Sequence, residues 1–190
     1  MKLTLRFKVA SEPSEFEQIH ELNYKTFVEE IPQHKRNEPH ILIDKFHSEN
    51  SYLICLHDDQ LVGMVAVRGK RPFSLDQKLP DLDSLLPPGR SVCEVRLLAV
   101  VRRYRNSIVL RGLLKLLLEY FKRHGYDLAI ISGIVRQQKL YHHLGFVPFG
   151  PLVGEPGAIF QPMWLAIEMF ENKVRVLRKD QRVPSDTTVL

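Results

Sequence analysis

Three arginines stand where a predicted strand passes into a predicted helix. An apolar run over residues 91–101 ends at Arg102, Arg103 and Arg105, and a leucine-rich pattern follows from residue 107. The first turn of a helix offers unpaired N–H groups and the positive end of the helix dipole, so this junction favours an anion such as phosphate. A phosphate-bearing ligand is therefore the first hypothesis, and a solvated surface turn is the alternative.

The helix that must hold this site is identified by one apolar stripe. Residues spaced by three and four positions form it: Leu110, Leu113, Leu114, Leu117, Leu118 and Phe121. This period predicts an α-helix over residues 107–124, which Gly125 is suited to end. Asn106 or Ser107 is the candidate N-terminal cap.

The other elements follow from the period of the apolar residues and from turn residues. They are a strand at 3–10, a helix from Ser14–Glu17 to about residue 30, a weaker helical stretch at 34–48, a β-hairpin at 50–69 turning near Asp58 and Asp59, a long excursion at 70–89, a strand at 127–135, a short helix at 136–146 and a last strand within 156–170. The alternation of strands and helices favours an α/β (α+β) protein with a mixed sheet flanked by helices.

Size and composition limit the class of protein. The chain has 190 residues, 44% of them hydrophobic, which suits one domain over residues 1–170 followed by a basic tail over 171–190. No apolar run reaches the length of a membrane span, and the N-terminus lacks the apolar core of a signal peptide, so we expect a cytoplasmic protein. Cys55 and Cys93 lie in strand-like runs and are expected to be small buried hydrophobes. The net charge of +5 fits an anionic ligand. Nucleic acid is not expected, because no nucleic-acid-binding motif occurs.

The junction resembles the cofactor-binding segment of the GNAT superfamily of acyl-CoA-dependent N-acyltransferases. The stretch LLAVVRRYRNSIVLRGLLKLLL carries the family's Leu-Ala-Val-like strand end, and KLYHHLGF over residues 139–146 resembles its Leu-Tyr-x-x-Leu-Gly-Phe motif. The resemblance covers about residues 3–168. It implies a mixed, mostly antiparallel central sheet, splayed between its fourth and fifth strands, and acyl-CoA, acetyl-CoA or longer, as co-substrate. The residues that it implies for the coenzyme are Leu98, Ala99, Val100, Arg103, Arg105, Asn106, Ser107, Ile108, Val109 and Leu110.

One departure concerns the loop that would hold the diphosphate. Ile108 and Leu110 stand where the family usually has two small residues, and an isoleucine tolerates neither a positive φ nor much crowding. Either the chain is helical there, with its amides still free for phosphate and the arginines compensating, or coenzyme A binding is altered or lost. The missing glycines also motivate a second hypothesis for the function, a GNAT-fold binding or regulatory domain that has lost catalysis and senses an acyl-thioester.

Two residues are the catalytic candidates for amine acylation. Tyr141 matches the tyrosine of the second motif, and the resemblance implies that it protonates the leaving thiolate. Glu94 is the candidate base, and a structural pair with Arg96 is the alternative. Simple alternation puts Val92, Glu94, Arg96 and Leu98 on one face of the strand and Cys93, Val95, Leu97 and Ala99 on the other. Arg96 and Ser132 are the candidate substrate-binding residues.

A narrower likeness concerns the donor and the acceptor. CEVRLLAV over 93–100 and ELNYKTFVEEI over 21–31 resemble segments of autoinducer synthases and N-acyl amino acid synthases. That likeness implies an amine or amino-acid acceptor and makes acyl carrier protein the alternative donor. A homodimer is left open, and no histidine pair has metal-ligand spacing, so no metal is expected.

Overall fold

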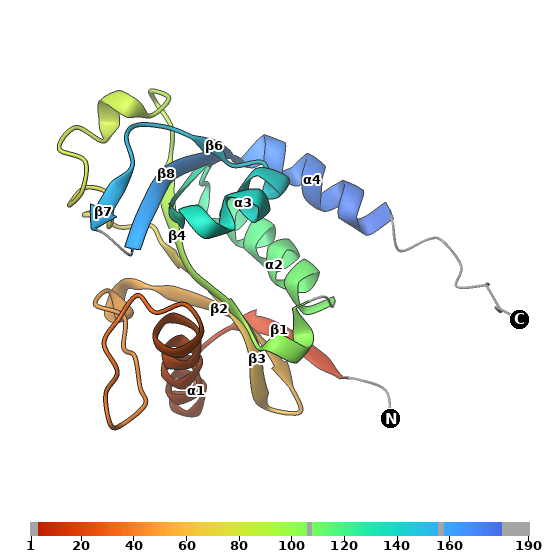
Figure 1. Ribbon diagram of the computed structural model, residues 1–190. Helices are drawn as coiled ribbons and strands as arrows, with labels where there is room; N and C mark the ends of the chain where they lie inside the picture. Colours follow the sequence, from red (N-terminus) through yellow and green to blue (C-terminus); the bar gives the residue numbers. More distant parts are fainter. Residues whose placement is uncertain (1–3, 106–107, 156–157, 180–190) are drawn as a thin grey trace, which may run out of the picture.

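The computed structural model describes residues 4–105, 108–155 and 158–179, with side chains as far as residue 175. Its strands form one mixed sheet in the order β1-β2-β3-β4-β5-β8-β6, and β7 pairs with β8 (Figure 1). The strands are β1 Leu5–Val9, β2 Ser51–His57, β3 Gln60–Arg68, β4 Val92–Val100, β5 Leu128–Ile134, β6 Val147–Pro148, β7 Val153–Glu155 and β8 Ala158–Ala166. Every pairing is antiparallel except that of β4 with β5. The predicted fold class is confirmed.

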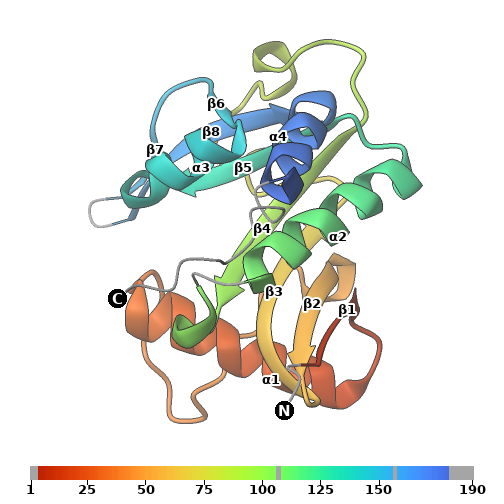
Figure 2. The ribbon, with the colours of Figure 1, turned by 90° about the vertical axis from the view of Figure 1, so that its right-hand side faces the viewer.

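Helices cover both faces of the sheet (Figures 1 and 2). They are α1 Pro13–Tyr24, α2 Ile108–His124, α3 Gln138–Leu144 and α4 Ile167–Lys179. Helix α1 continues as a π-helical segment over Lys25–Glu30. Short 3-10 turns in the described residues lie at His47–Glu49, Asp83–Leu85, Arg102–Tyr104 and Val135–Gln137. Alternation along β3 separates two cores: Met64 and Ala66 pack with α1, whereas Val65 and Val67 pack with α2. The sheet therefore carries a different hydrophobic core on each face.

Local signals placed most elements correctly. Asp58 and Asp59 both have positive φ, at 49° and 64°, as a two-residue hairpin turn requires, and the hairpin is confirmed. The helical stretch predicted over 34–48 is wrong apart from the short turn at its end. Pro39 interrupts any helix there, and the Asn37 side chain hydrogen-bonds both backbone groups of Ile41.

The C-terminal part also differs from the prediction. The last strand ends at Ala166, and residues 167–179 form α4, whose Phe170 and Val174 pack against the core under α2. The expected basic tail thus begins as a helix that contributes to the core. Residues 180–190 lie outside the described residues.

The glycine inside α2 has a packing reason. A Cβ on Gly112 would lie 2.1 Å from the ring of Phe7 on β1. Glycine costs helix stability relative to alanine, but here it lets the helix approach the edge of the sheet closely.

Strands β4 and β5 part after three residue pairs. Their parallel register joins Val92–Glu94 to Leu128–Ile130 and stops there, although β4 continues to Val100 and β5 to Ile134. In Figure 2 the two strands run apart beyond this point. The predicted splay between the fourth and fifth strands is confirmed, and it opens a wedge in the middle of the sheet.

A β-bulge sits in β4 beside this wedge. Ala66 pairs with Arg96 and Met64 with Ala99, so Leu97 and Leu98 together oppose Val65. Leu97 has a φ of 53°, and this extra residue reverses the alternation that follows. Leu97 and Ala99 therefore pack on the α1 side and Leu98 on the α2 side, so the faces predicted for these three residues are wrong.

Candidate acyltransferase site

A small cavity runs from the wedge into the core under α2. It measures about 80 Å³, and its polar lining consists of Arg96, Ser132 and Tyr141. Its remaining walls are apolar side chains from the sheet and from α2, α3 and α4. The cavity brings together one predicted catalytic residue, Tyr141, and both predicted substrate-binding residues.

Tyr141 lies on α3 and its ring faces β5. A Cβ on Gly133 would lie 2.8 Å from that ring, so the glycine permits the close contact. Burial raises the pKa of the Tyr141 phenol, and a hydrogen bond from the Ile134 amide to the phenol oxygen opposes this in part. Tyr141 is therefore a neutral hydroxyl that can give a proton, as the second motif implied.

Ser132 and a lysine that sequence reasoning missed meet at the mouth of the wedge. The ammonium of Lys78, on the long excursion, donates to the hydroxyl of Ser132 at 3.0 Å and lies 4.4 Å from the ring centroid of Phe160. Lys78 is exposed at the surface, yet the protein atoms packed around its ammonium lower its pKa, and the charge of Arg96 adds to this while Glu94 opposes it. A lysine within a Pro- and Asp-rich excursion carried no sequence signal for this role.

Glu94, the candidate base, is fully buried and does not line the cavity. Its two carboxylate oxygens accept the Ser74 N–H at 3.1 and 3.0 Å, and one also accepts the Ser74 hydroxyl. A guanidinium nitrogen of Arg96 lies 3.5 Å from it. These are the contacts of the structural alternative, in which Glu94 anchors the excursion and Arg96.

Arg96 belongs to a buried polar cluster on the α1 side of the sheet. It pairs with Asp44 at 2.7 Å, and although burial alone would raise the pKa of Asp44, the Arg96 charge and hydrogen bond hold it below its ordinary value. Phe46 lies between Arg96 and Arg68, whose guanidinium carbons are 4.9 and 3.6 Å from the ring centroid. The Nε atoms of both arginines have no hydrogen-bond partner among the described residues.

The arginine turn is held by its own contacts rather than left free. Arg105 donates from Nε to the Val100 carbonyl at 2.9 Å and pairs with Glu30 after α1. The hydroxyl of Tyr104 lies 2.6 Å from Nδ1 of His57 on β2. Arg105 therefore fixes the turn, whereas the exposed Arg102 and Arg103 are the charges that face solvent.

The missing glycines also have an explanation in the backbone. Ile108, Val109 and Leu110 lie in the first turn of α2, so none of them needs a positive φ. The Ile108 side chain is exposed and that of Val109 is buried. Asn106 and Ser107, the predicted caps, lie outside the described residues. The chain is helical from Ile108, as the first alternative requires, and the binding of a phosphate by its amides stays a prediction.

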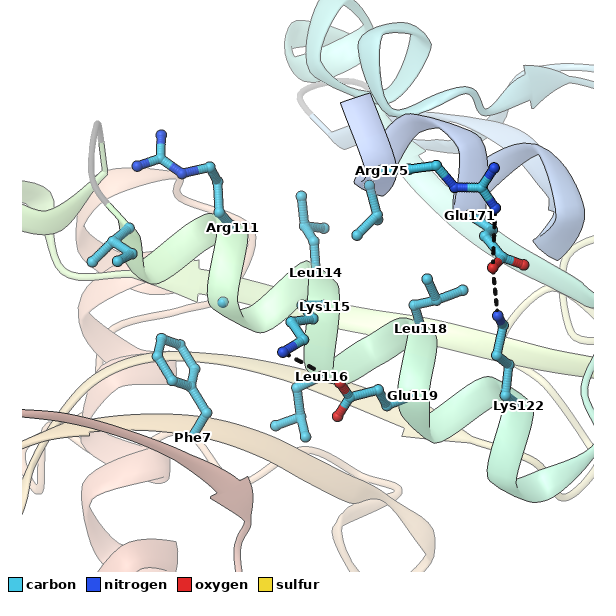
Figure 3. A pocket seen from close by; sticks show the side chains of 13 residues that line it. Phe7, Arg111, Leu114, Lys115, Leu116, Leu118, Glu119, Lys122, Glu171 and Arg175 are labelled. Carbon is cyan, nitrogen blue, oxygen red and sulfur yellow. Dashed lines mark ion pairs between the residues drawn. The ribbon is translucent and has the colours of Figure 1, made fainter. Parts of the chain in front are cut away.

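A larger groove lies elsewhere, along α2 between β1 and α4 (Figure 3). Its volume is about 600 Å³, and it shares only Leu114 with the wedge cavity. Glu171 pairs there with Lys122 at 2.7 Å and with Arg175 at 3.5 Å. Size does not make it the reaction site, because it holds neither Tyr141 nor an edge of the wedge.

Within the described residues, no cluster of three or more metal-ligating side chains is found. Likewise, none of the helices there is long and apolar enough to cross a membrane. The expectation of a metal-free protein stays a prediction.

A mixed sheet that splays between β4 and β5, with a helix N-terminus and an arginine turn at one end of the gap and a tyrosine on the next helix, defines a GNAT-like acyltransferase. The model of the family "N-acyl amino acid synthase FeeM" matches residues 18–168, and the chain belongs to that family. The protein is therefore an enzyme of the acyltransferase class.

Solved structures agree in fold. The CoA-dependent acyl-homoserine lactone synthase BjaI, solved with SAM and isopentyl-CoA, has a TM-score of 0.78 at 20% identity, over 98% of this chain and 96% of that one. FeeM, an N-acyl amino acid synthase from uncultured soil microbes, has a TM-score of 0.70 at 14% identity, over 94% of this chain and 99% of that one. The AHL synthase LasI has a TM-score of 0.70 at 14% identity, over 87% of this chain and 91% of that one. No curated protein matches the chain.

Proposed function

We propose that the protein acylates the amine of an amino acid by direct transfer from an acyl thioester. The observation that carries the proposal is the wedge between β4 and β5, with Tyr141, Arg96 and Ser132 around one cavity. Acyl-CoA is the proposed donor, and an acyl carrier protein is the alternative, because both present the same pantetheine arm. Free backbone edges of the two strands would pair with the amides of that arm.

The acceptor is proposed to enter from the α1 side, where the cations lie. Arg96 lines the cavity, and the charges of Arg96 and Lys45 act on Lys78 at its mouth. A carboxylate is the substrate group that such a cationic mouth favours. The family, whose model is described as N-acyl amino acid synthase, supports the same acceptor class.

The proposed chemistry balances without a metal or a covalent enzyme intermediate. The acceptor ammonium first loses a proton to Lys78 in its neutral form, which passes it to water. The amine nitrogen then bonds to the thioester carbon, the carbon–sulfur bond breaks, and Tyr141 gives its proton to the leaving thiolate. The second amine proton leaves to water and Tyr141 regains one, so the products are an amide, a thiol and one proton.

The test uses the purified full chain with acyl-CoA or acyl carrier protein and a panel of amino acids. Thiol release and the mass of the N-acyl product are measured together. Product with at least one amino acid is the expected result. Donor binding without product from any amine would instead indicate the sensing domain, and no binding of either donor would overturn both readings.

A further inference from the structure

The wedge cavity has a mouth and a floor. Arg96, Ser132 and Tyr141 are each partly exposed and mark the mouth. Four lining residues are at most 1% exposed and mark the buried end: Leu113, Phe121, Leu165 and Phe170. Walls between these ends are apolar. If the thioester carbonyl lies beside Tyr141, as the proposed function requires, the acyl tail points inward along this cavity.

Two aromatic rings line the buried end. Phe121 comes from α2 and Phe170 from α4, and their ring centroids lie 6.1 Å apart in an edge-to-face arrangement. Both belong to the close-packed core that includes Leu117 and Leu165. Interiors packed this tightly do not yield a further tunnel without displacing a ring.

The volume limits the tail that fits. An apolar cavity of about 150 Å³ holds one benzene molecule, a ring of six carbons. The cavity here measures about 80 Å³, roughly half of that. Three or so tail carbons therefore fill it, about half the carbons of a benzene ring.

Resting on the proposed function, we infer that the donor carries a short aliphatic acyl group and that Phe121 and Phe170 set its length. Butanoyl and 3-methylbutanoyl groups match the cavity. Acetyl leaves most of it empty, and octanoyl or dodecanoyl tails meet the aromatic pair.

Equilibrium binding tests this without turnover. S-alkyl coenzyme A thioethers, and the matching S-alkyl pantetheines that represent the arm of a carrier protein, are titrated with chains from ethyl to dodecyl. Affinity is expected to rise about fourfold per added methylene, the value of about 0.8 kcal/mol per buried methylene, until the cavity is full. Beyond butyl or pentyl, affinity should stay level or fall.

Phe121→Leu and Phe170→Leu are expected to move this break to longer chains, and to shift the turnover preference the same way by about tenfold. Leucine keeps the core apolar and is chosen because Phe→Ala would leave a large cavity in the core and risk unfolding the protein. Phe73→Leu is the matched control, since Phe73 is equally buried but lies in a separate cluster. It should lower the melting temperature without moving the break.

A wild-type preference for acetyl or dodecanoyl donors, or a break that neither leucine variant moves, would overturn the inference. Amide product with donors of the wrong length would leave the proposed function intact. Failure of every thioether to bind and of every donor to react would remove both.

Discussion

At the scale of single residues, the proposed reaction depends on how the folded chain surrounds a few polar side chains. The surrounding protein raises the pKa of Tyr141 and lowers the pKa of Lys78, and the carboxylate oxygens of Glu94 accept the Ser74 N–H. Tyr141 lies on α3 and Lys78 on the long excursion, and only the folded chain brings both to the wedge.

Tyr141→Phe is expected to lower kcat by about 10²–10⁴-fold, because it removes the general acid. Donor KM should change little, since the ring that packs on Gly133 remains. Steady-state kinetics measure both constants. Tyr120→Phe is the control, because its hydroxyl bonds Ser51 at 2.8 Å outside the cavity. Unchanged turnover in Tyr141→Phe would remove Tyr141 from the mechanism.

If Lys78 is the base, its titration sets the acid limb of the pH profile of kcat/KM. A base acts when it is neutral, so kcat/KM should rise as pH rises through the pKa of Lys78, which burial places below the ordinary lysine value of 10.5. Lys78→Met should lower the plateau by about 10²-fold and abolish that limb. Lys78→Arg should not restore it, because arginine stays charged.

Lys70→Met, a change on the same excursion, is the matched control and should leave the profile unaltered. A limb that persists in Lys78→Met would assign the proton acceptor to another group.

At the scale of elements, close approach and long-range ties decide the geometry. The arginine turn is tied to α1 through Arg105 and Glu30 and to the hairpin through Tyr104 and His57. The bulge at Leu97 re-aims the end of β4 beside the wedge. Each element is local, but its orientation is fixed by a partner far away in the chain.

Glu30→Gln is expected to loosen the turn and raise the donor KM by about two- to fivefold, the effect of a partly exposed ion pair. kcat should stay the same, because Glu30 lies away from the cavity. Glu29→Gln removes a neighbouring exposed carboxylate and should leave KM unchanged. Equal KM values in both variants would show that the tie does not position the donor.

Gly112→Ala is expected to destabilise the protein, although alanine favours a helix by about 1 kcal/mol. The new methyl group would meet the Phe7 ring at 2.1 Å. Thermal melts should show a lower melting temperature in Gly112→Ala alone. In the Phe7→Leu background the same change should be neutral or stabilising, and a loss of equal size in both backgrounds would contradict the packing explanation.

At the scale of the whole molecule, the splayed sheet joins two halves, and the core under α2 spans both of them. One half packs α1 on β2 and β3, and the other packs α3 and α4 around β5 and β8 (Figure 1). Strand β4 belongs to both, so a donor in the wedge contacts both halves at once.

Bound S-butyl coenzyme A is expected to slow amide hydrogen exchange by about tenfold in residues 95–100 and 131–134, the strand segments beyond the last β4–β5 pair. Amides of β2 already pair on both sides and serve as the internal control. Protection confined to the groove between α2 and α4 would place the donor there and contradict the wedge.

The sequence by itself determined the elements whose signals are local. The apolar stripe from Leu110 to Phe121 requires a helix, the aspartates at 58 and 59 require a turn, and the two motifs identified the acyltransferase fold. Periodicity is a property of neighbouring residues, so it can be read without the fold.

Tertiary structure decided which side chains meet. The bulge at Leu97 reversed the side-chain alternation in the last part of β4, and Arg105 pairs with Glu30. Lys78 donates to Ser132, and Phe170 of α4 packs edge to face on Phe121. Such contacts join residues tens of positions apart, and their energies depend on burial and distance rather than on spacing along the chain.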